Sequence, residues 1–176
     1  MEFQARNLDE ATIKGFEAKL LADLSGLSAA LEGFKLRAAY AYADGENLED
    51  NTPINSIDPQ QLVLGIGYAS QGDRWGIEAV VNSTDRKDRS DIDASSLQQA
   101  GAPLIAAFET PGFTTFDLIG YYNVNDKLRL NYGVFNVTDK QTFSWSEEFV
   151  QDPATANFDR LSEAGRNFSL SLKYTF

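Results

Sequence analysis

The side chains that most often carry out chemistry in proteins are scarce in this sequence. Its 176 residues include no histidine and no cysteine. Without them the chain cannot build a Ser-His-Asp or Cys-His catalytic site, a usual zinc site, or the commonest protein ligand of haem iron. We therefore expect that the chain is not an enzyme and that it holds no metal or cofactor of its own.

A charged stretch near the middle of the chain offers the first candidate binding residues. Arg86, Lys87 and Arg89 are interspersed with four aspartates between residues 85 and 93. Such a run can contact a protein ligand, but mixed charges more often form a solvated loop. A calcium site is not favoured, because the acidic spacing and the glycine of a calcium loop are missing. We expect a solvated loop, and its three cations are only weak candidates for ligand contact.

Aromatic residues gather in a second long polar stretch between residues 138 and 165. They are Phe143, Trp145, Phe149 and Phe158. Aromatic side chains are common anchors of protein interfaces. They can equally pack against one another and so order a long loop. The sequence leaves both interpretations open.

Charge and hydropathy narrow the class of partner. The net charge of −11 argues against nucleic acid. Mean hydropathy is −0.32, and no run approaches the roughly 18 apolar residues that a membrane-spanning helix needs. A membrane β-barrel stays possible, because alternate residues of its strands are polar and the average conceals the lipid-facing half.

The strands that position these residues are predicted from the alternation of apolar and polar residues along the sequence. At the end of the chain, Phe168, Leu170, Leu172, Tyr174 and Phe176 alternate with polar residues, which is typical of a strand with one apolar face. The same alternation occurs over residues 12–24, 34–42, 62–69, 75–82, 115–124 and 128–135. Residues 1–10 read as the end of another strand and a turn. A helix is the rival interpretation for residues 9–31, but the charges at every second position favour a strand.

The connections between these strands alternate in length. Residues 25–33, 70–74 and 124–127 are short connections, whereas residues 44–58, 84–112 and 138–165 are long ones. Outer-membrane barrels have short periplasmic turns and long extracellular loops. The pattern therefore predicts an all-β fold of antiparallel transmembrane β-barrel strands, with the C-terminus at the periplasmic end.

Outward-facing aromatic residues are expected at two heights, as in membrane barrels. Those near the short turns form a predicted short-turn girdle of Phe34, Tyr68, Trp75, Tyr122, Tyr174 and Phe176. Those near the long loops form a predicted long-loop girdle of Phe16, Tyr40, Tyr42, Phe116 and Phe168. A soluble β-sandwich, the main alternative, predicts neither the girdles nor the loop pattern. Charged residues on the other face imply a hydrated interior or one filled by a polar domain.

Several segments resemble a known family in the same order along the chain. They are ATIKGFEAKL (11–20), TPINSIDPQQLVLGIGY (52–68), DRWGIEA (73–79), FETPGFTTFDLIGYY (108–122), LNYGVFNVTDKQ (130–141) and GRNFSLSLKYTF (165–176). These segments are similar to the C-terminal end of TonB-dependent outer-membrane receptors. Within that family they are most similar to the haemoglobin/haem and transferrin receptor branch.

The resemblance implies a barrel of about 22 strands around a plug domain, of which residues 1–176 supply about the last eight strands. It implies a plug upstream of residue 1, energy from TonB through that plug, and haem or a ferric chelate as cargo rather than cofactor. It further implies the outer membrane of a Gram-negative bacterium, a haem-carrying protein as partner, and Phe176 as the signal read by the barrel-assembly machinery. On this basis the segment alone is not expected to transport anything.

Besides these, an enzyme embedded in a barrel is not favoured, because without histidine it would lack the usual Ser-His pair. Two other functions stay open from the sequence. The first is a complete small outer-membrane barrel with a structural or adhesive role, since even strand numbers from about eight upward occur. The second is a soluble lipocalin-like binder.

Overall fold

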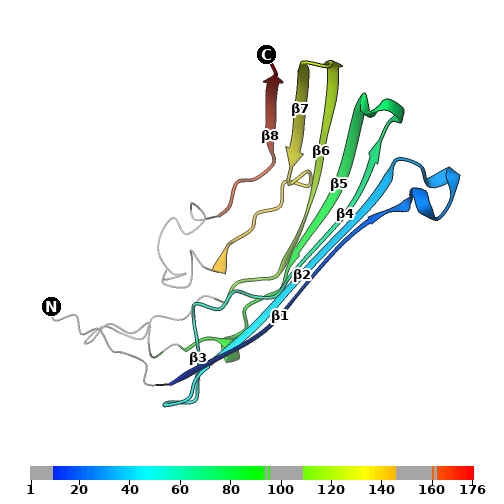
Figure 1. Ribbon diagram of the computed structural model, residues 1–176. Coiled ribbons are helices and arrows are strands. Elements are labelled where there is room, and N and C mark those ends of the chain that lie inside the picture. Colours follow the sequence, from blue (N-terminus) through cyan, green and yellow to red (C-terminus); the bar gives the residue numbers. More distant parts are fainter. Residues whose placement is uncertain (1–9, 94, 96–108, 146–159, 161) are drawn as a thin grey trace.

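The fold is a single curved antiparallel sheet. The computed structural model describes residues 10–93, 95, 109–145, 160 and 162–176. The strands are β1 (Ala11–Asp23), β2 (Phe34–Asn47), β3 (Thr52–Pro53), β4 (Gln61–Ala69), β5 (Trp75–Thr84), β6 (Phe113–Asn125), β7 (Leu128–Phe135) and β8 (Asn167–Tyr174). They are ordered β1-β2-β4-β5-β6-β7-β8, and β3 pairs with β2 (Figure 1). Among the described residues, no helix is long and apolar enough to cross a membrane.

The seven predicted strands are confirmed, and within residues 9–31, where a helix was the rival interpretation, strand β1 occupies Ala11–Asp23. The strand end and turn predicted at residues 1–10 lie outside the described residues, apart from residue 10. The sequence placed a loop at residues 44–58, and here the structure differs. Strand β2 continues to Asn47, and β3 pairs with it through Glu46–Pro53 and Asn47–Thr52. The backbone N–H of Ile54 also donates to the carbonyl of Gly45 at 2.9 Å. The base of this loop is therefore a small hairpin made of polar residues.

The short connections are compact turns at one end of the sheet. Single turns of 3-10 helix, η1 (Leu24–Gly26) and η2 (Ala29–Leu31), join β1 to β2, and η3 (Gln71–Asp73) joins β4 to β5. Between β6 and β7, the carboxamide oxygen of Asn125 accepts hydrogen bonds from two backbone N–H groups, each at 2.9 Å. Beside that turn, the N–H of Thr175 donates to the carbonyl of Lys127 at 2.8 Å, so the C-terminus lies at the short-turn end (Figure 1).

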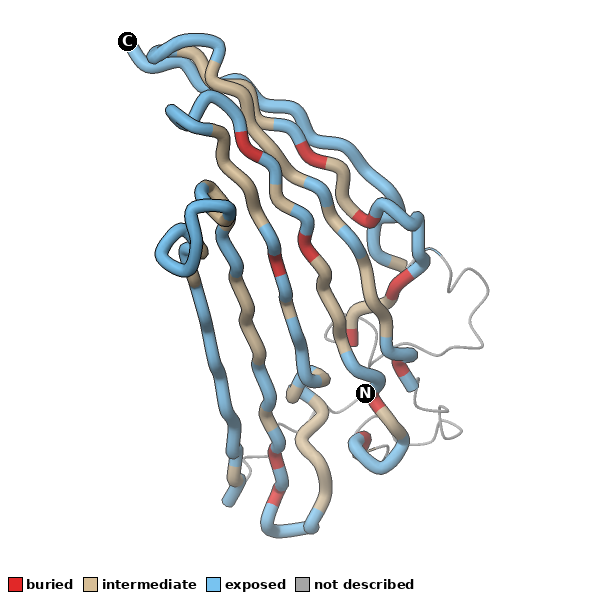
Figure 2. Tube along the Cα trace, turned by 90° about the vertical axis from the view of Figure 1, so that its right-hand side faces the viewer, coloured by how far each residue is buried: buried red, intermediate tan, exposed pale blue. Residues whose placement is uncertain are grey.

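The sheet has no second layer against either face among the described residues. Most strand residues are exposed or half-buried (Figure 2). The buried hydrophobic residues among those described are only Val80, Ile92 and Trp145, and two of these lie beyond the strand ends. Strands β1 and β8 stand at opposite ends of the strand order. The segment is therefore an open part of a barrel wall rather than a domain with a closed core.

Candidate functional site

The register joins the apolar residues of all seven long strands into one continuous face, here called the convex face. Leu64 lies opposite Ala38 on one side and Val81 on the other. Leu118 lies opposite Ala79 and Val134 in the same way. The exposed fractions of Leu64, Leu118 and Leu170 are 44%, 39% and 73%. An exposed apolar surface of this extent, which no other described residue covers, marks an interaction site for an apolar partner.

Aromatic rings of the short-turn girdle lie next to one another on the convex face. The Phe34 and Tyr68 ring centroids are 4.9 Å apart, and those of Tyr68 and Trp75 are 5.4 Å apart. Trp75 is paired across the strands with Tyr122. At the C-terminus, the Tyr174 and Phe176 rings are 5.1 Å apart in an edge-on arrangement. The structure thus brings these sequence-predicted residues together along one rim.

The residues of the long-loop girdle lie at the opposite ends of the same strands. Phe16 is paired with Tyr42, and its ring centroid is 6.4 Å from that of Tyr40. Further along the sheet, Phe116 is paired with Val81 and Phe168 with Val134. Phe16, Tyr42, Phe116 and Phe168 are exposed on the convex face, with exposed fractions from 45% to 75%.

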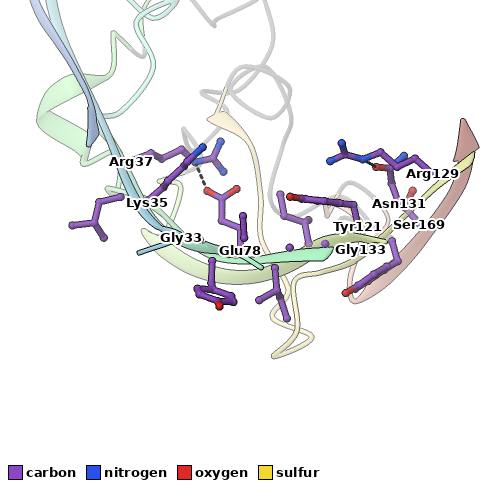
Figure 3. A pocket seen from close by; sticks show the side chains of 18 of the residues that line it. Gly33, Lys35, Arg37, Glu78, Tyr121, Arg129, Asn131, Gly133 and Ser169 are labelled. Carbon is purple, nitrogen blue, oxygen red and sulfur yellow. Dashed lines mark hydrogen bonds and ion pairs between the residues drawn. The ribbon is translucent and has the colours of Figure 1, made fainter. Parts of the chain in front are cut away.

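The opposite, concave face carries the charged side chains of the strands. They surround a wide pocket of about 600 Å³, lined by residues that include Arg37, Glu78, Tyr121 and Arg129 (Figure 3). The Nε atom of Arg37 lies 2.9 Å from Oε1 of Glu78, an ion pair without good hydrogen-bond alignment. The guanidinium carbon of Arg129 lies 3.6 Å from the Tyr121 ring centroid. Both arginines therefore lie along the wall of the pocket.

Glycines on neighbouring strands make room for two side chains of this wall. A Cβ atom at Gly65 would lie 2.6 Å from the Glu78 carboxylate, and one at Gly76 would clash with the Tyr121 ring. The absence of Cβ atoms at Gly65 and Gly76 lets the side chains of Glu78 and Tyr121 approach the adjacent strand closely. The concave face therefore carries polar side chains that pack closely over glycines of the neighbouring strands.

The long loops are joined to one another by two of the candidate binding residues. The ammonium group of Lys87 donates to the carbonyl of Ile57 at 2.7 Å and lies 5.3 Å from the Trp145 ring centroid. The indole N–H of Trp145 donates to the carbonyl of Asn55 at 2.7 Å. Lys87 is 6% exposed and Trp145 is 3% exposed. These contacts connect residues 54–57, the loop after β5 and the loop after β7.

These contacts of Lys87 and Trp145 with residues 54–57 are here called the loop cluster. Burial shifts the protonation equilibrium of Lys87 within it. Desolvation lowers the pKa of Lys87, and the carboxylates of Asp91, Asp58 and Asp44 oppose that shift. Nearby, the backbone N–H of Arg86 and the amide of Gln60 hold the pKa of Asp85 below its usual value.

The other ligand-loop candidates have different surroundings. Arg86 is exposed and pairs with Asp88 at 3.0 Å, and Arg89 is exposed at the start of η4 (Arg89–Asp91). Phe143 is half-buried. Phe149 lies outside the described residues. The expected solvated charge run is therefore present at Arg86 and Arg89, whereas Lys87 and Trp145 form a buried contact instead.

A turn after β7, which we did not single out from the sequence as a site, closes the base of the last long loop. The side chain of Asn136 exchanges hydrogen bonds with the backbone of Lys140 at 2.7 and 3.0 Å, and Asn136 N–H donates to Asp117 at 2.8 Å. Asp139 accepts from the backbone N–H of Arg166 at 2.7 Å. Asn and Asp tolerate the left-handed backbone that both residues adopt, with φ of 49° and 55°, so the Asn-x-x-Asp spacing was the available signal.

Comparisons with known proteins agree on one fold. Residues 2–137 match the family described as TonB dependent receptor-like, beta-barrel. Hemoglobin-binding protein A of Haemophilus influenzae is 28% identical over 99% of this chain and 18% of its own length. Hemoglobin-haptoglobin utilization protein B of Neisseria meningitidis is 27% identical over 99% of this chain and 23% of its own length.

Solved structures are similar in the same way. Copper transporter OprC superposes with a TM-score of 0.73 at 22% identity, covering 94% of this chain and 24% of its own. The FrpB iron transporter from Neisseria meningitidis gives a TM-score of 0.69 at 15% identity, with 94% and 24% covered. The chain thus spans about a fifth of the length of the curated relatives it matches.

Proposed function

This chain belongs to the TonB-dependent receptor β-barrel family, and from that premise we propose that it forms the C-terminal barrel wall of an outer-membrane receptor for haem or iron. The relatives with printed haemoglobin-binding names favour a haem-carrying protein as the source of the cargo. Haem or a ferric chelate is then cargo in transit, and this segment holds no cofactor.

One observation carries the membrane part of this proposal: the convex face is apolar from edge to edge between the two aromatic girdles. Trp and Tyr favour the two interfaces of a bilayer, and aliphatic residues favour its centre. The proposed location is the outer membrane of a Gram-negative bacterium. The short turns then face the periplasm and the long loops face the exterior.

The remaining proposed partners contact the concave face and the two open edges of the sheet. A polar wall bearing Arg37, Glu78 and Arg129 suits contact with a polar plug domain, through which TonB would act. The unpaired backbone groups along β1 and β8 would be costly in lipid, so upstream strands of the same receptor are the proposed neighbours. Phe176 at the short-turn rim is the proposed signal for the barrel-assembly machinery.

The charge of the long loops favours a particular kind of ligand surface. Residues 44–58, 84–112 and 138–165 hold 16 of the 26 acidic residues and 5 of the 15 basic ones, which equals the whole net charge of −11. Electrostatic complementarity speeds the encounter of such a surface with a basic patch on a protein. Within this acidic surface, the exposed cations Arg86 and Arg89 and the aromatic Phe143 are proposed to contact acidic or apolar groups of the ligand, while Lys87 and Trp145 hold the loops in position.

The test is growth on a protein-bound haem source. A strain whose receptor gene lacks the region for residues 1–176 is expected to lose growth on haemoglobin and to keep growth on a ferrous salt. Restoring the intact gene should restore growth on haemoglobin. Unchanged growth of the deletion strain on haemoglobin would contradict the proposed cargo.

A further inference from the structure

Arg74 stands at the short-turn girdle of the convex face. Arg74 ends the β4–β5 turn and is exposed. Its Nε–H donates to the hydroxyl of Tyr122 at 3.1 Å, and its guanidinium carbon lies 5.6 Å from the Tyr122 ring centroid. Because the Tyr122 ring belongs to the convex face, these two contacts hold the cation on the side where the sheet is apolar.

The same turn directs its acidic residue the other way. Asp73 accepts a hydrogen bond from the hydroxyl of Tyr121, which lines the concave pocket. The ion pairs among the described residues are Arg37–Glu78, Arg86–Asp88 and Arg166–Asp139, so Arg74 is not neutralised by a carboxylate. The turn thus separates its two charges, with the anion inward and the cation outward.

Other aromatic residues of the short-turn girdle lie next to the Arg74–Tyr122 pair. Trp75 follows directly in the chain, is paired with Tyr122, and is 41% exposed. The rings of Tyr68 and Phe34 continue from Trp75 along the rim. An amphipathic aromatic rim suits the level of lipid headgroups, and an arginine there meets phosphate rather than water alone. With Nε–H bonded to Tyr122, the terminal amino groups of the guanidinium are the donors that would reach a phosphate.

We propose that Arg74, Tyr122 and Trp75 form a binding site for the phosphate of an anionic phospholipid in the leaflet that meets the short turns. Arginine binds phosphate oxygens by charge-assisted hydrogen bonds, and Tyr122 orients the guanidinium toward them. Trp75 covers the glycerol region beside that phosphate. This site rests on the proposed membrane function and adds to it a preference for one class of lipid.

The experiment measures phospholipid retained by the full-length receptor. Receptor stripped of lipid in detergent is incubated with phosphatidylglycerol or phosphatidylcholine, and bound lipid is counted by native mass spectrometry. The wild-type receptor should retain phosphatidylglycerol preferentially. The variant Arg74→Gln should lower its apparent affinity by about fivefold, the effect of one cation near an anionic surface. Tyr122→Phe should cause a smaller loss, because the ring remains and only the orienting hydroxyl is removed.

The matched control is Lys127→Gln, which removes one exposed positive charge from the neighbouring short turn. This variant should keep the wild-type preference for phosphatidylglycerol. Equal losses for Arg74→Gln and Lys127→Gln would overturn the site in favour of general charge attraction. Competition by free glycerol phosphate as strong as that by phosphatidylglycerol would overturn its assignment to lipid. If neither lipid binds any of these proteins, the membrane function itself fails rather than this site alone.

Discussion

At the scale of single residues, Leu170 and Ser171 are neighbours on β8 whose side chains leave opposite faces of the sheet. Leu170 lies opposite Tyr132 on the convex face, and Ser171 accepts a hydrogen bond from Asn131 on the concave face. Leu170→Arg should cost about 2–4 kcal/mol of unfolding free energy if the residue is near mid-bilayer, and Ser171→Arg much less. Denaturant unfolding of the receptor in phospholipid vesicles measures both. Equal costs would contradict the assigned facing.

The buried ammonium group of Lys87 should make the stability of the loop cluster depend on pH. Burial lowers the pKa of Lys87, so the unfolded loops bind its proton more tightly than the folded loops do. Below the lowered pKa both forms are charged, and the full cost of burying the ammonium is present. As the pH rises through the lowered pKa toward the ordinary value of about 10.4, the stability of the loop cluster should increase.

Limited proteolysis of the loops at a series of pH values measures this effect. Lys87→Met keeps the packing against Trp145 and removes the titrating group, so the increase in protection with pH should disappear. Arg89→Met is the control, since Arg89 is exposed and outside the cluster. The same pH dependence in wild type and Lys87→Met would show that another group is responsible.

At the scale of elements, the turn after β7 links three strands. Asn136 bonds to Asp117 of β6 and to Lys140, and Asp139 bonds to Arg166 just before β8. Asn136 is 6% exposed with a positive φ. Asn136→Ala should therefore cost about 2–3 kcal/mol through lost hydrogen bonds and a strained backbone. Asn136→Gly should cost about 1 kcal/mol less, because glycine accepts the left-handed conformation.

Unfolding midpoints of the two variants, together with hydrogen exchange at residues 138–142, test this prediction. A stability ranking of wild type, then glycine, then alanine is expected. If alanine were tolerated as well as glycine, the left-handed backbone conformation at Asn136 would not affect the free energy of unfolding.

The strands themselves were predictable because alternation is a local signal. Leu64 and Leu118 could be assigned to the exposed face, since a period of two depends only on immediate neighbours. The extension of β2 to Asn47 was missed, because Asp44, Gly45 and Glu46 have low strand propensity. Their pairing with β1 and β3 overrides that propensity.

The loop cluster was less predictable, because its contacts join distant parts of the chain. Lys87 meets Ile57 across 30 positions, and Trp145 meets Asn55 across 90. Mixed charges around Lys87 indicate solvent exposure, and nothing local distinguishes it from Arg86 or Arg89. For Trp145 the sequence left anchoring and packing open, and the structure shows packing.

At the scale of the whole molecule, the open sheet predicts how the segment behaves by itself. Strands β1 and β8 do not pair with each other among the described residues, so their outer edges have no partner. Residues 1–176 produced alone and mixed with detergent should therefore not give a compact, heat-modifiable band on a gel. The same region within the full-length receptor should. A heat-modifiable monomer of the isolated segment would instead support the complete small barrel.

In the proposed receptor the convex face meets lipid while the concave face meets water or a polar domain. The sequence has no cysteine, so single cysteines can be introduced at positions 169, 170, 171 and 172 of β8 and at 77, 78, 79 and 80 of β5. In the membrane-inserted receptor, spin labels at these positions are compared for collision with oxygen and with a water-soluble nickel chelate. We predict that oxygen access peaks at 77, 79, 170 and 172 and falls at each neighbour. Oxygen access without this alternation, or highest at 78, 80, 169 and 171, would contradict the assignment of the convex face to lipid.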